Sequence, residues 1–132
     1  MASGRISGFG KTTVILDASQ ISSSSGSVMS GSAVRFEYNQ HALTCNIYIR
    51  IQNPNDRPTI TVSGLPSGFP EFARIGAPSH ARIGTTNSIT DACIINHTEN
   101  ETTMTITFFN FIGHFPSGSG YLVTSDDFTV LY

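Results

Sequence analysis

Apolar and polar residues alternate with a period of two along much of this chain, which is the pattern of β-strands with one buried face. The clearest run is 44–52, in which a cysteine and three isoleucines alternate with polar residues. The run 34–38 alternates in the same way, and residues 39–41 between the two fit a hairpin connection. A strong Asn/Pro turn signal at 53–58 follows, so we expect the strands here to form a meander.

Further strands are predicted along the rest of the chain, at 12–16, 59–63, 91–96, 102–112, 121–124 and 128–132. Because the last of them runs to the final residue, we expect that end to be tied into the fold. No stretch of about ten residues has the helical period. Seven to nine short strands joined by turns predict an all-β protein, either an antiparallel β-sandwich or a jelly roll.

The beginning of the chain is mostly small and polar, with 12–16 as its one apolar run. The Ser/Gly segment 21–27 has too little apolar area to offset the entropy lost on ordering. We therefore predict that residues 1–31 are a flexible lead with one short strand. The packed domain is expected to span residues 32–132.

A short repeat occurs in the middle of the chain. The tetrapeptide Ala-Arg-Ile-Gly at 73–76 recurs at 81–84, on either side of a predicted turn. Two interpretations stay open. Two short strands could present Arg74 and Arg82 beside His80 to an anionic ligand, or the repeat is a coincidence in a hairpin whose arginines are solvated.

The second half of the run 102–112 is apolar on both faces, because Phe109 and Phe111 fall on the side that threonines occupy before them. Either a β-bulge resets the register or another subunit covers the strand. The phenylalanines at 108, 109, 111 and 115 are thus candidates for a monomer core or for a core between subunits.

Composition narrows the classes of function. Charged residues make up 12% of the 132 residues and the net charge is −2, while Lys11 is the single lysine, so no basic stripe offers itself to nucleic acid. The chain has 17 Ser and 15 Thr, which favour strands and a surface solubilised by hydroxyl groups, as suits extracellular or virion proteins. No 18-residue apolar run is present, so we expect no membrane insertion, and no apolar signal core is seen at the N-terminus.

The sequence contains little support for a catalytic site. The Gly-rich segment 8–13 lacks the spacing, the preceding strand and the following helix of a phosphate loop. No Gly-x-Ser-x-Gly elbow occurs. The acid pairs Glu99/Glu101 and Asp126/Asp127 fall in predicted turns, where solvation is expected rather than a catalytic cleft. We predict that the protein is not an enzyme.

Metal and cysteine chemistry is similarly unsupported. Cys45 and Cys93 fall on predicted core positions of strands, where they form either one disulfide or two buried thiols. Sequons at Asn96 and Asn100 are interpreted as chance in a Thr-rich chain, although they indicate an exposed turn. The histidines lack the spacing of a zinc site, so we expect no metal and no cofactor; they are His41, His80, His97 and His114.

Three short segments carry a resemblance to a known group of proteins. They are Asn-Ile-Tyr-Ile-Arg at 46–50, Ile-Thr-Val-Ser-Gly-Leu-Pro at 60–66 and Gly-Ser-Gly-Tyr-Leu-Val at 118–123. Across 32–132 the chain resembles the distal, receptor-binding modules of bacteriophage tail fibres and baseplate proteins. The resemblance implies a homotrimeric β-sandwich head at the tail tip of the virion, extracellular after release. It also implies two kinds of partner, a host-surface saccharide or protein and other tail subunits.

The resulting hypothesis is a non-enzymatic receptor-binding module whose ligand is a cell-surface saccharide. Guanidinium, imidazole and phenol groups can hydrogen-bond to polyols or hold acidic sugars. The alternatives are a jelly-roll virion assembly or decoration protein, and a depolymerising enzyme with paired acids in a cleft. The predicted ligand-binding residues are Tyr48, Arg50, Arg74, His80, Arg82 and His114.

Overall fold

The computed structural model describes residues 3–6, 10–54, 58–83, 87–98, 101–108 and 121–132. For residues 3–6, 75–83 and 87–93 it describes the backbone alone. The strands in these ranges are β1 (Ser3–Ile6), β2 (Thr12–Asp17), β3 (Ile21–Ser23), β4 (Ser27–Val28), β5 (Ala33–Tyr38), β6 (Ala42–Gln52), β7 (Ile60–Ser63), β8 (Phe72–Ile83), β9 (Asn87–His97), β10 (Thr103–Phe108) and β11 (Tyr121–Leu131). One 3-10 turn, η1 (Ala18–Gln20), joins β2 to β3.

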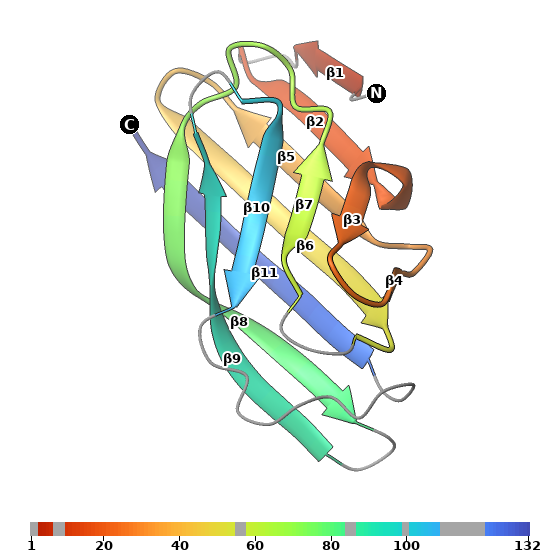
Figure 1. Ribbon diagram of the computed structural model, residues 1–132. Helices are drawn as coiled ribbons and strands as arrows, with labels where there is room; N and C mark the ends of the chain where they lie inside the picture. Colours follow the sequence, from red (N-terminus) through yellow and green to blue (C-terminus); the bar gives the residue numbers. More distant parts are fainter. Residues whose placement is uncertain (1–2, 7–9, 55–57, 84–86, 99–100, 109–120) are drawn as a thin grey trace.

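The strands form one antiparallel sheet, so the prediction of an all-β antiparallel fold is confirmed. The strand order is β1-β2-β5-β6-β11-β8-β9-β10-β7-β3, and β4 pairs with β6. Figure 1 shows the sheet doubled over, with β7 and β10 passing in front of β5, β6 and β11. The two halves are joined at β8, where residues 79–82 pair with 121–124 of β11.

The core lies between the two halves of the sheet. Phe36 of β5 faces Phe72 of β8, with ring centroids 6.2 Å apart, and Phe72 in turn lies 5.9 Å from Phe128 of β11. Inward positions on each strand are apolar and buried, as the alternation predicts, and Ile49 and Met104 are both fully buried. At about 25 cal/mol per Å² this burial supplies the main favourable contribution to folding.

The predicted hairpin over 34–52 is confirmed, but the meander beyond it is wrong. β5 pairs with β6, and the side chain of Asn39 closes their turn. The next strand, β7, instead pairs with β10 and β3. Turn signals in a sequence show where the chain changes direction and do not show which strand it meets next.

The predicted flexible lead is also wrong, because the described part of residues 1–31 belongs to the sheet. β2 pairs with β5 over six residues, while β3 pairs with β7 and β4 with β6. Val14, Leu16 and Ile21 are buried in the core. A few inward apolar side chains are enough here, since neighbouring strands supply the backbone hydrogen bonds.

Two predicted turns are continuous strand. The expected turn at 77–80 lies inside β8, where a register shift between Ile75 and Ala77 absorbs the extra residue. The expected break at 125–127 lies inside β11, which pairs with β6 along its whole length. Asp126 and Asp127 are therefore strand residues and not turn acids. Glycine, proline and aspartate are weak strand formers, but pairing to neighbours overrides that preference.

Gly26 provides a test of how tightly β4 is held to β6. Its φ is +75°, and a Cβ added there would lie 2.6 Å from the carbonyl oxygen of Gln52. We expect Gly26→Ala to lower the free energy of unfolding by about 2 kcal/mol, through left-handed strain plus this clash. Gly31→Ala is the matched control, because Gly31 has φ +88° and open space, and it should cost only about 1 kcal/mol. Equal losses in urea titrations of the two variants would show that the clash contributes nothing.

Candidate functional site

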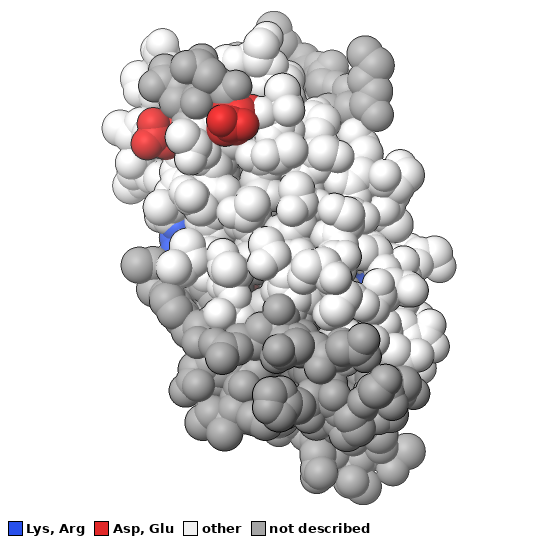
Figure 2. Space-filling view, in the orientation of Figure 1, with Lys and Arg blue, Asp and Glu red and all other residues white. Residues whose placement is uncertain are grey.

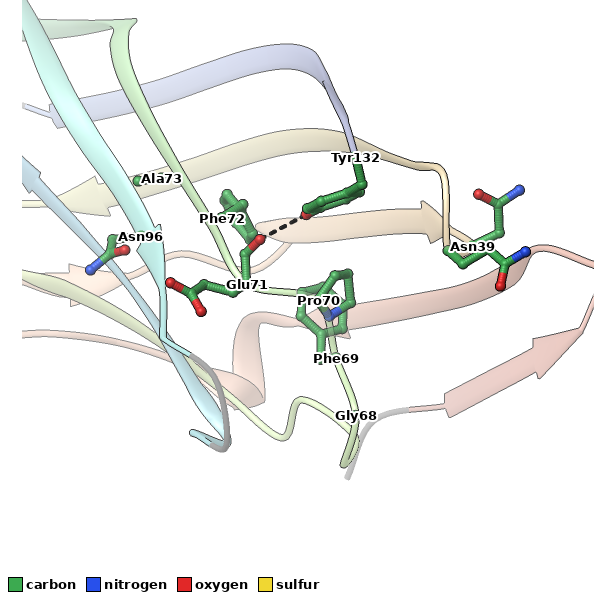
Figure 3. Close-up of a pocket in the computed structure, with 10 residues that line it drawn as sticks. Asn39, Gly68, Phe69, Pro70, Glu71, Phe72, Ala73, Asn96 and Tyr132 are labelled. Carbon is green, nitrogen blue, oxygen red and sulfur yellow. Dashed lines mark hydrogen bonds between the residues drawn. The ribbon is translucent and has the colours of Figure 1, made fainter.

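A cavity of about 600 Å³ lies at the end of the fold where the β5–β6 turn, the segment before β8 and the end of β11 meet (Figure 3). Its volume is within the range of small-ligand sites, and its lining mixes apolar rings with amide, carboxylate and phenol groups. The lining residues are Asn39, Gln40, Gly68, Phe69, Pro70, Glu71, Phe72, Ala73, Asn96 and Tyr132.

The segment that forms one wall begins with a tight turn. The amide of Phe69 donates to the carbonyl oxygen of Pro66 at 3.3 Å, and Gly68 has φ +78°. This is the geometry of a type II turn, which requires a positive φ at its third residue and therefore favours glycine there. The turn directs Phe69 into the core, where it is buried.

The floor of the pocket is a packed aromatic cluster. The ring of Phe69 lies 4.8 Å from that of Phe36 and 4.9 Å from that of Tyr38, both edge to face. Burial raises the pKa of Tyr38 above its ordinary value. Such contacts fix ring orientations as well as burying area. These contacts therefore fix the position of the Phe69 ring beneath the wall.

His97 connects this wall to the segment between β9 and β10. The side chain is fully buried at the end of β9, with Nδ1 3.0 Å from the carbonyl oxygen of Pro70 and Nε2 2.8 Å from that of Glu101. Its ring also packs edge to face on Phe69 at 5.1 Å. The sequence pattern predicts that His97 lies in an exposed turn. Its neighbours Asn96 and Thr98 are exposed, but His97 itself points inward.

Tyr132 forms the opposite wall and is held at both ends. Its amide donates to the carbonyl oxygen of His41 at 2.8 Å, and its hydroxyl donates to the carbonyl oxygen of Glu71 at 2.9 Å. The expectation that this end of the chain is tied in is thus confirmed. Partial burial and the nearby carboxylate of Glu71 both raise the phenol pKa, so the hydroxyl remains a donor. The side chain is still 52% exposed, which leaves part of the ring open to a ligand.

Amide groups and one carboxylate supply the polar part of the pocket. The Oδ1 atom of Asn39 accepts from the amides of His41 and Ala42 at 2.8 and 3.0 Å, so the turn orients this side chain. Its NH₂ group remains a donor. Glu71 has the one charged side chain among the described residues that line the cavity. The site thus presents donors, acceptors and one negative charge.

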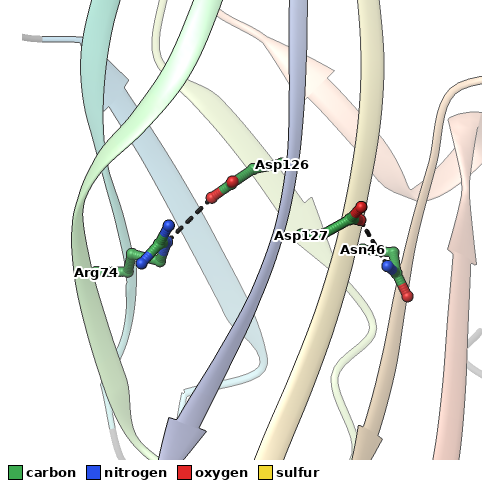
Figure 4. Close-up of polar contacts among 4 residues, drawn as sticks. All are labelled: Asn46, Arg74, Asp126 and Asp127. Atoms are coloured by element: carbon green, nitrogen blue, oxygen red, sulfur yellow. Dashed lines mark hydrogen bonds and ion pairs between the residues drawn. The ribbon is translucent and has the colours of Figure 1, made fainter.

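Arg74, a predicted ligand residue, is used inside the fold instead (Figure 4). Its Nε donates to Oδ2 of Asp126 at 3.0 Å, and its guanidinium lies 4.8 Å above the ring of Phe128. The side chain of Asp126 is only 8% exposed. This ion pair spans the gap where β8 departs from β11, so Arg74 has a structural role.

Tyr48 and Arg50 lie together on the outer face of β6, as the alternation predicts. Tyr48 is 46% exposed beside a shallow depression that Asn46 and Asp127 also line. The Arg50 guanidinium lies 5.3 Å from the ring of Tyr121 on the neighbouring strand. The pair is on the surface of the other half of the sheet and does not contribute to the pocket.

For two of the remaining predicted ligand residues, His80 and Arg82, the structure describes the backbone alone. His80 is opposite Val123 and Arg82 is opposite Tyr121 in the pairing of β8 with β11. Residues 73–76 and 81–83 of the repeat therefore lie in one continuous strand and not in two strands around a turn. His114 lies outside the described residues, as do Phe109, Phe111 and Phe115.

Sequence reasoning missed the pocket because its residues come from distant parts of the chain. In the sequence, Asn39 belongs to a predicted hairpin connection, Asn96 to a sequon and Tyr132 to the end of a predicted strand. The available signal was that turn residues on rigid scaffolds often carry function. Nothing local indicates that these turns gather at the same end of the sheet.

The described residues were also compared with the requirements of a reactive thiol, a metal site and a membrane-spanning helix. Cys45 is a free, buried thiol, and burial together with the carboxylates of Asp126 and Asp127 raises its pKa far above the ordinary value. That thiol is a core residue and a poor nucleophile. Among the described residues, no three His, Cys, Asp or Glu side chains gather as metal ligands. Nor does that part of the chain contain a helix with the length and apolar character needed to cross a membrane.

Comparison with known proteins gives no information on function, so the function is inferred from the chemistry of the pocket. A scan against family models, a search of curated proteins and a search of solved structures each found no match to this chain.

Proposed function

We propose that this protein is a non-enzymatic saccharide-binding module whose ligand occupies the pocket beside Tyr132. The observation that carries the proposal is a partly exposed tyrosine ring, fixed by hydrogen bonds at both ends, facing side-chain amides across a preformed cavity. A ring of this kind offers an apolar face to a sugar ring, and amides donate to and accept from its hydroxyl groups. Because the walls are already ordered, little conformational entropy is lost on binding.

The charge of the pocket narrows the class of saccharide. Glu71 repels carboxylates and sulfates at short range and attracts ammonium groups. The positive charge of Arg74 does not balance it, because Arg74 is paired with Asp126. The ligand is therefore a neutral or amino sugar, and acidic sugars of the kind the predicted Arg and His residues would hold are disfavoured.

The biological setting we propose is the receptor-binding head of a phage tail fibre or baseplate protein, on the virion and directed at the host surface. Support comes from the resemblance of residues 32–132 to such modules and from an all-β sheet doubled over a single core, which suits a β-sandwich head. A homotrimer is part of this proposal. Light scattering should then give three times the mass of the 14.2 kDa chain, and a monomer would contradict the trimer.

The proposed site predicts a specific pattern of binding to a panel of immobilised neutral, amino and acidic glycans. Tyr132→Ala should lower affinity at least about tenfold, since one stacked ring and its ordering are lost. Tyr48→Ala is the matched control, an exposed tyrosine on the other half of the sheet, and it should leave binding unchanged. Glu71→Gln should abolish the preference for amino over acidic glycans while neutral glycans bind within about twofold.

Four results would count against this proposal. Binding of no glycan by the intact protein would overturn it, and attachment only to virion particles would favour the assembly protein instead. Loss of binding in Tyr48→Ala and not in Tyr132→Ala would move the site to the depression on β6. Release of reducing ends from a polysaccharide would show an enzyme.

A further inference from the structure

The outer face of the sheet beside the pocket is covered by hydroxyl groups. The outward residues of β7 and β10 are Thr61, Ser63, Thr103, Thr105 and Thr107. Figure 2 shows the surface over these two strands almost free of charged side chains, with acidic groups only near its upper end. A surface with this many hydroxyls and so few charges suits a ligand that is itself uncharged and rich in hydroxyls.

One row of this face leads directly into the pocket. By register, Ser22 of β3 is opposite Thr61, Thr61 is opposite Thr105, and Thr105 is opposite Asn96. Asn96 is in turn opposite Ala73 of β8, and both of these residues line the pocket. Residues directly opposite each other share a face of the sheet, and strands are about 4.8 Å apart, so the row is about 19 Å long.

The polar groups in the row are available to a ligand. Thr61, Thr105 and Asn96 use no side-chain atom in a hydrogen bond within the described part of the chain. Ser22 donates weakly to the carbonyl oxygen of Thr61 at 3.5 Å, which leaves its own oxygen as an acceptor. Each strand crossed thus offers at least one unused hydroxyl or amide.

We propose that this row is an extended subsite, so that the ligand is a linear, neutral polysaccharide whose end enters the pocket and whose chain crosses β9, β10, β7 and β3. This inference rests on the proposed saccharide-binding function and deepens it. The pocket anchors one or two sugar units, and the row adds one neutral hydrogen bond or more per strand crossed. Branched or uniformly charged chains do not fit, because the row is a single uncharged track.

The test is calorimetry with cello-, malto- and N-acetylchito-oligosaccharides, each from the monosaccharide to the hexasaccharide. For the series that binds, the hexasaccharide should bind at least about tenfold tighter than the disaccharide, as two added hydrogen bonds would give. Thr105→Val should cost the hexasaccharide about fivefold and leave the disaccharide unchanged. Valine keeps the β-branched shape, so the strand is preserved. Thr129→Val, at an exposed position of β11 in the other half of the sheet, is the matched control and should change neither.

The outcomes separate this inference from the function on which it rests. If the intact protein binds no saccharide of any length, the proposed function fails and the subsite with it. If short saccharides bind through Tyr132 but affinity stays flat with length, the subsite is overturned while the pocket stands. An equal loss for disaccharide and hexasaccharide in Thr105→Val would also overturn the subsite.

Discussion

Replacing His97 with alanine is expected to lower the free energy of unfolding by about 3–4 kcal/mol, the largest effect of any change considered for this protein. The side chain is fully buried, and its loss leaves a cavity beside Phe69 and Phe72. It also removes the ring nitrogens that lie 3.0 Å from the carbonyl oxygen of Pro70 and 2.8 Å from that of Glu101. Urea titration should show a lower midpoint with an unchanged slope.

A second variant separates packing from hydrogen bonding. His97→Phe retains a ring of similar size in contact with Phe69 but has no N–H to donate to either carbonyl group. We expect it to lose about 1–2 kcal/mol, less than the alanine variant. Because Pro70 lines the pocket, the His97→Phe variant should also bind saccharides more weakly. Wild-type stability in His97→Phe would show that hydrogen bonding by the His97 ring nitrogens does not hold the wall.

Replacing Arg74 with alanine is expected to lower the free energy of unfolding by about 3 kcal/mol, because it leaves the carboxylate of Asp126 nearly buried without its counter-ion. This loss of free energy is at the low end of that expected on breaking a buried ion pair, because the Arg74 side chain is 36% exposed and water can reach the site. The variant also removes the guanidinium that lies over Phe128. Thermal or urea unfolding measures the loss.

The neighbouring acid of β11 supplies the control for this ion pair. Asp127 is exposed on the opposite face and accepts a hydrogen bond from Asn46 (Figure 4). Asp127→Ala should therefore change stability by less than about 0.5 kcal/mol. The double variant Arg74→Met/Asp126→Leu should recover most of the loss of Arg74→Ala, because apolar residues need no counter-ion. Equal losses for Arg74→Ala and Asp127→Ala would contradict a structural role for the pair.

These two contacts connect stability to the proposed function. His97 holds the wall that Pro70 and Glu71 contribute to the pocket. Arg74 holds β8 near β11 just beyond Ala73, where the row of hydroxyls ends. His97 is buried and Arg74 is partly exposed. Both hold the walls in place, so their loss should weaken binding through disorder of the walls. Tyr132→Ala, in contrast, should reduce binding with little loss of stability, because the ring is half exposed.

Much of the secondary structure is determined by the sequence itself. Alternation at 34–38 and 44–52 predicts β5, β6 and the hairpin between them, because the inward face of a strand must be apolar whatever its partner is. The same argument predicts Tyr48 and Arg50 on one outer face. The sequence also has few charged residues and many Ser and Thr residues. Hydroxyl side chains accordingly cover the outer surface of β7 and β10.

What only the tertiary structure decided is the pairing of strands and, through it, the site. Gly76, Pro78, Asp126 and Asp127 are poor strand residues, yet they lie in strands because neighbours on the sheet satisfy their backbones. Segment 21–28 joins the sheet for the same reason. Long-range pairing also turned Arg74 inward and brought the β5–β6 turn to Tyr132. A local pattern indicates which face of a strand is buried. The free energy that selects the partner of that strand comes from residues far away in the chain. The pocket forms only where these distant partners meet.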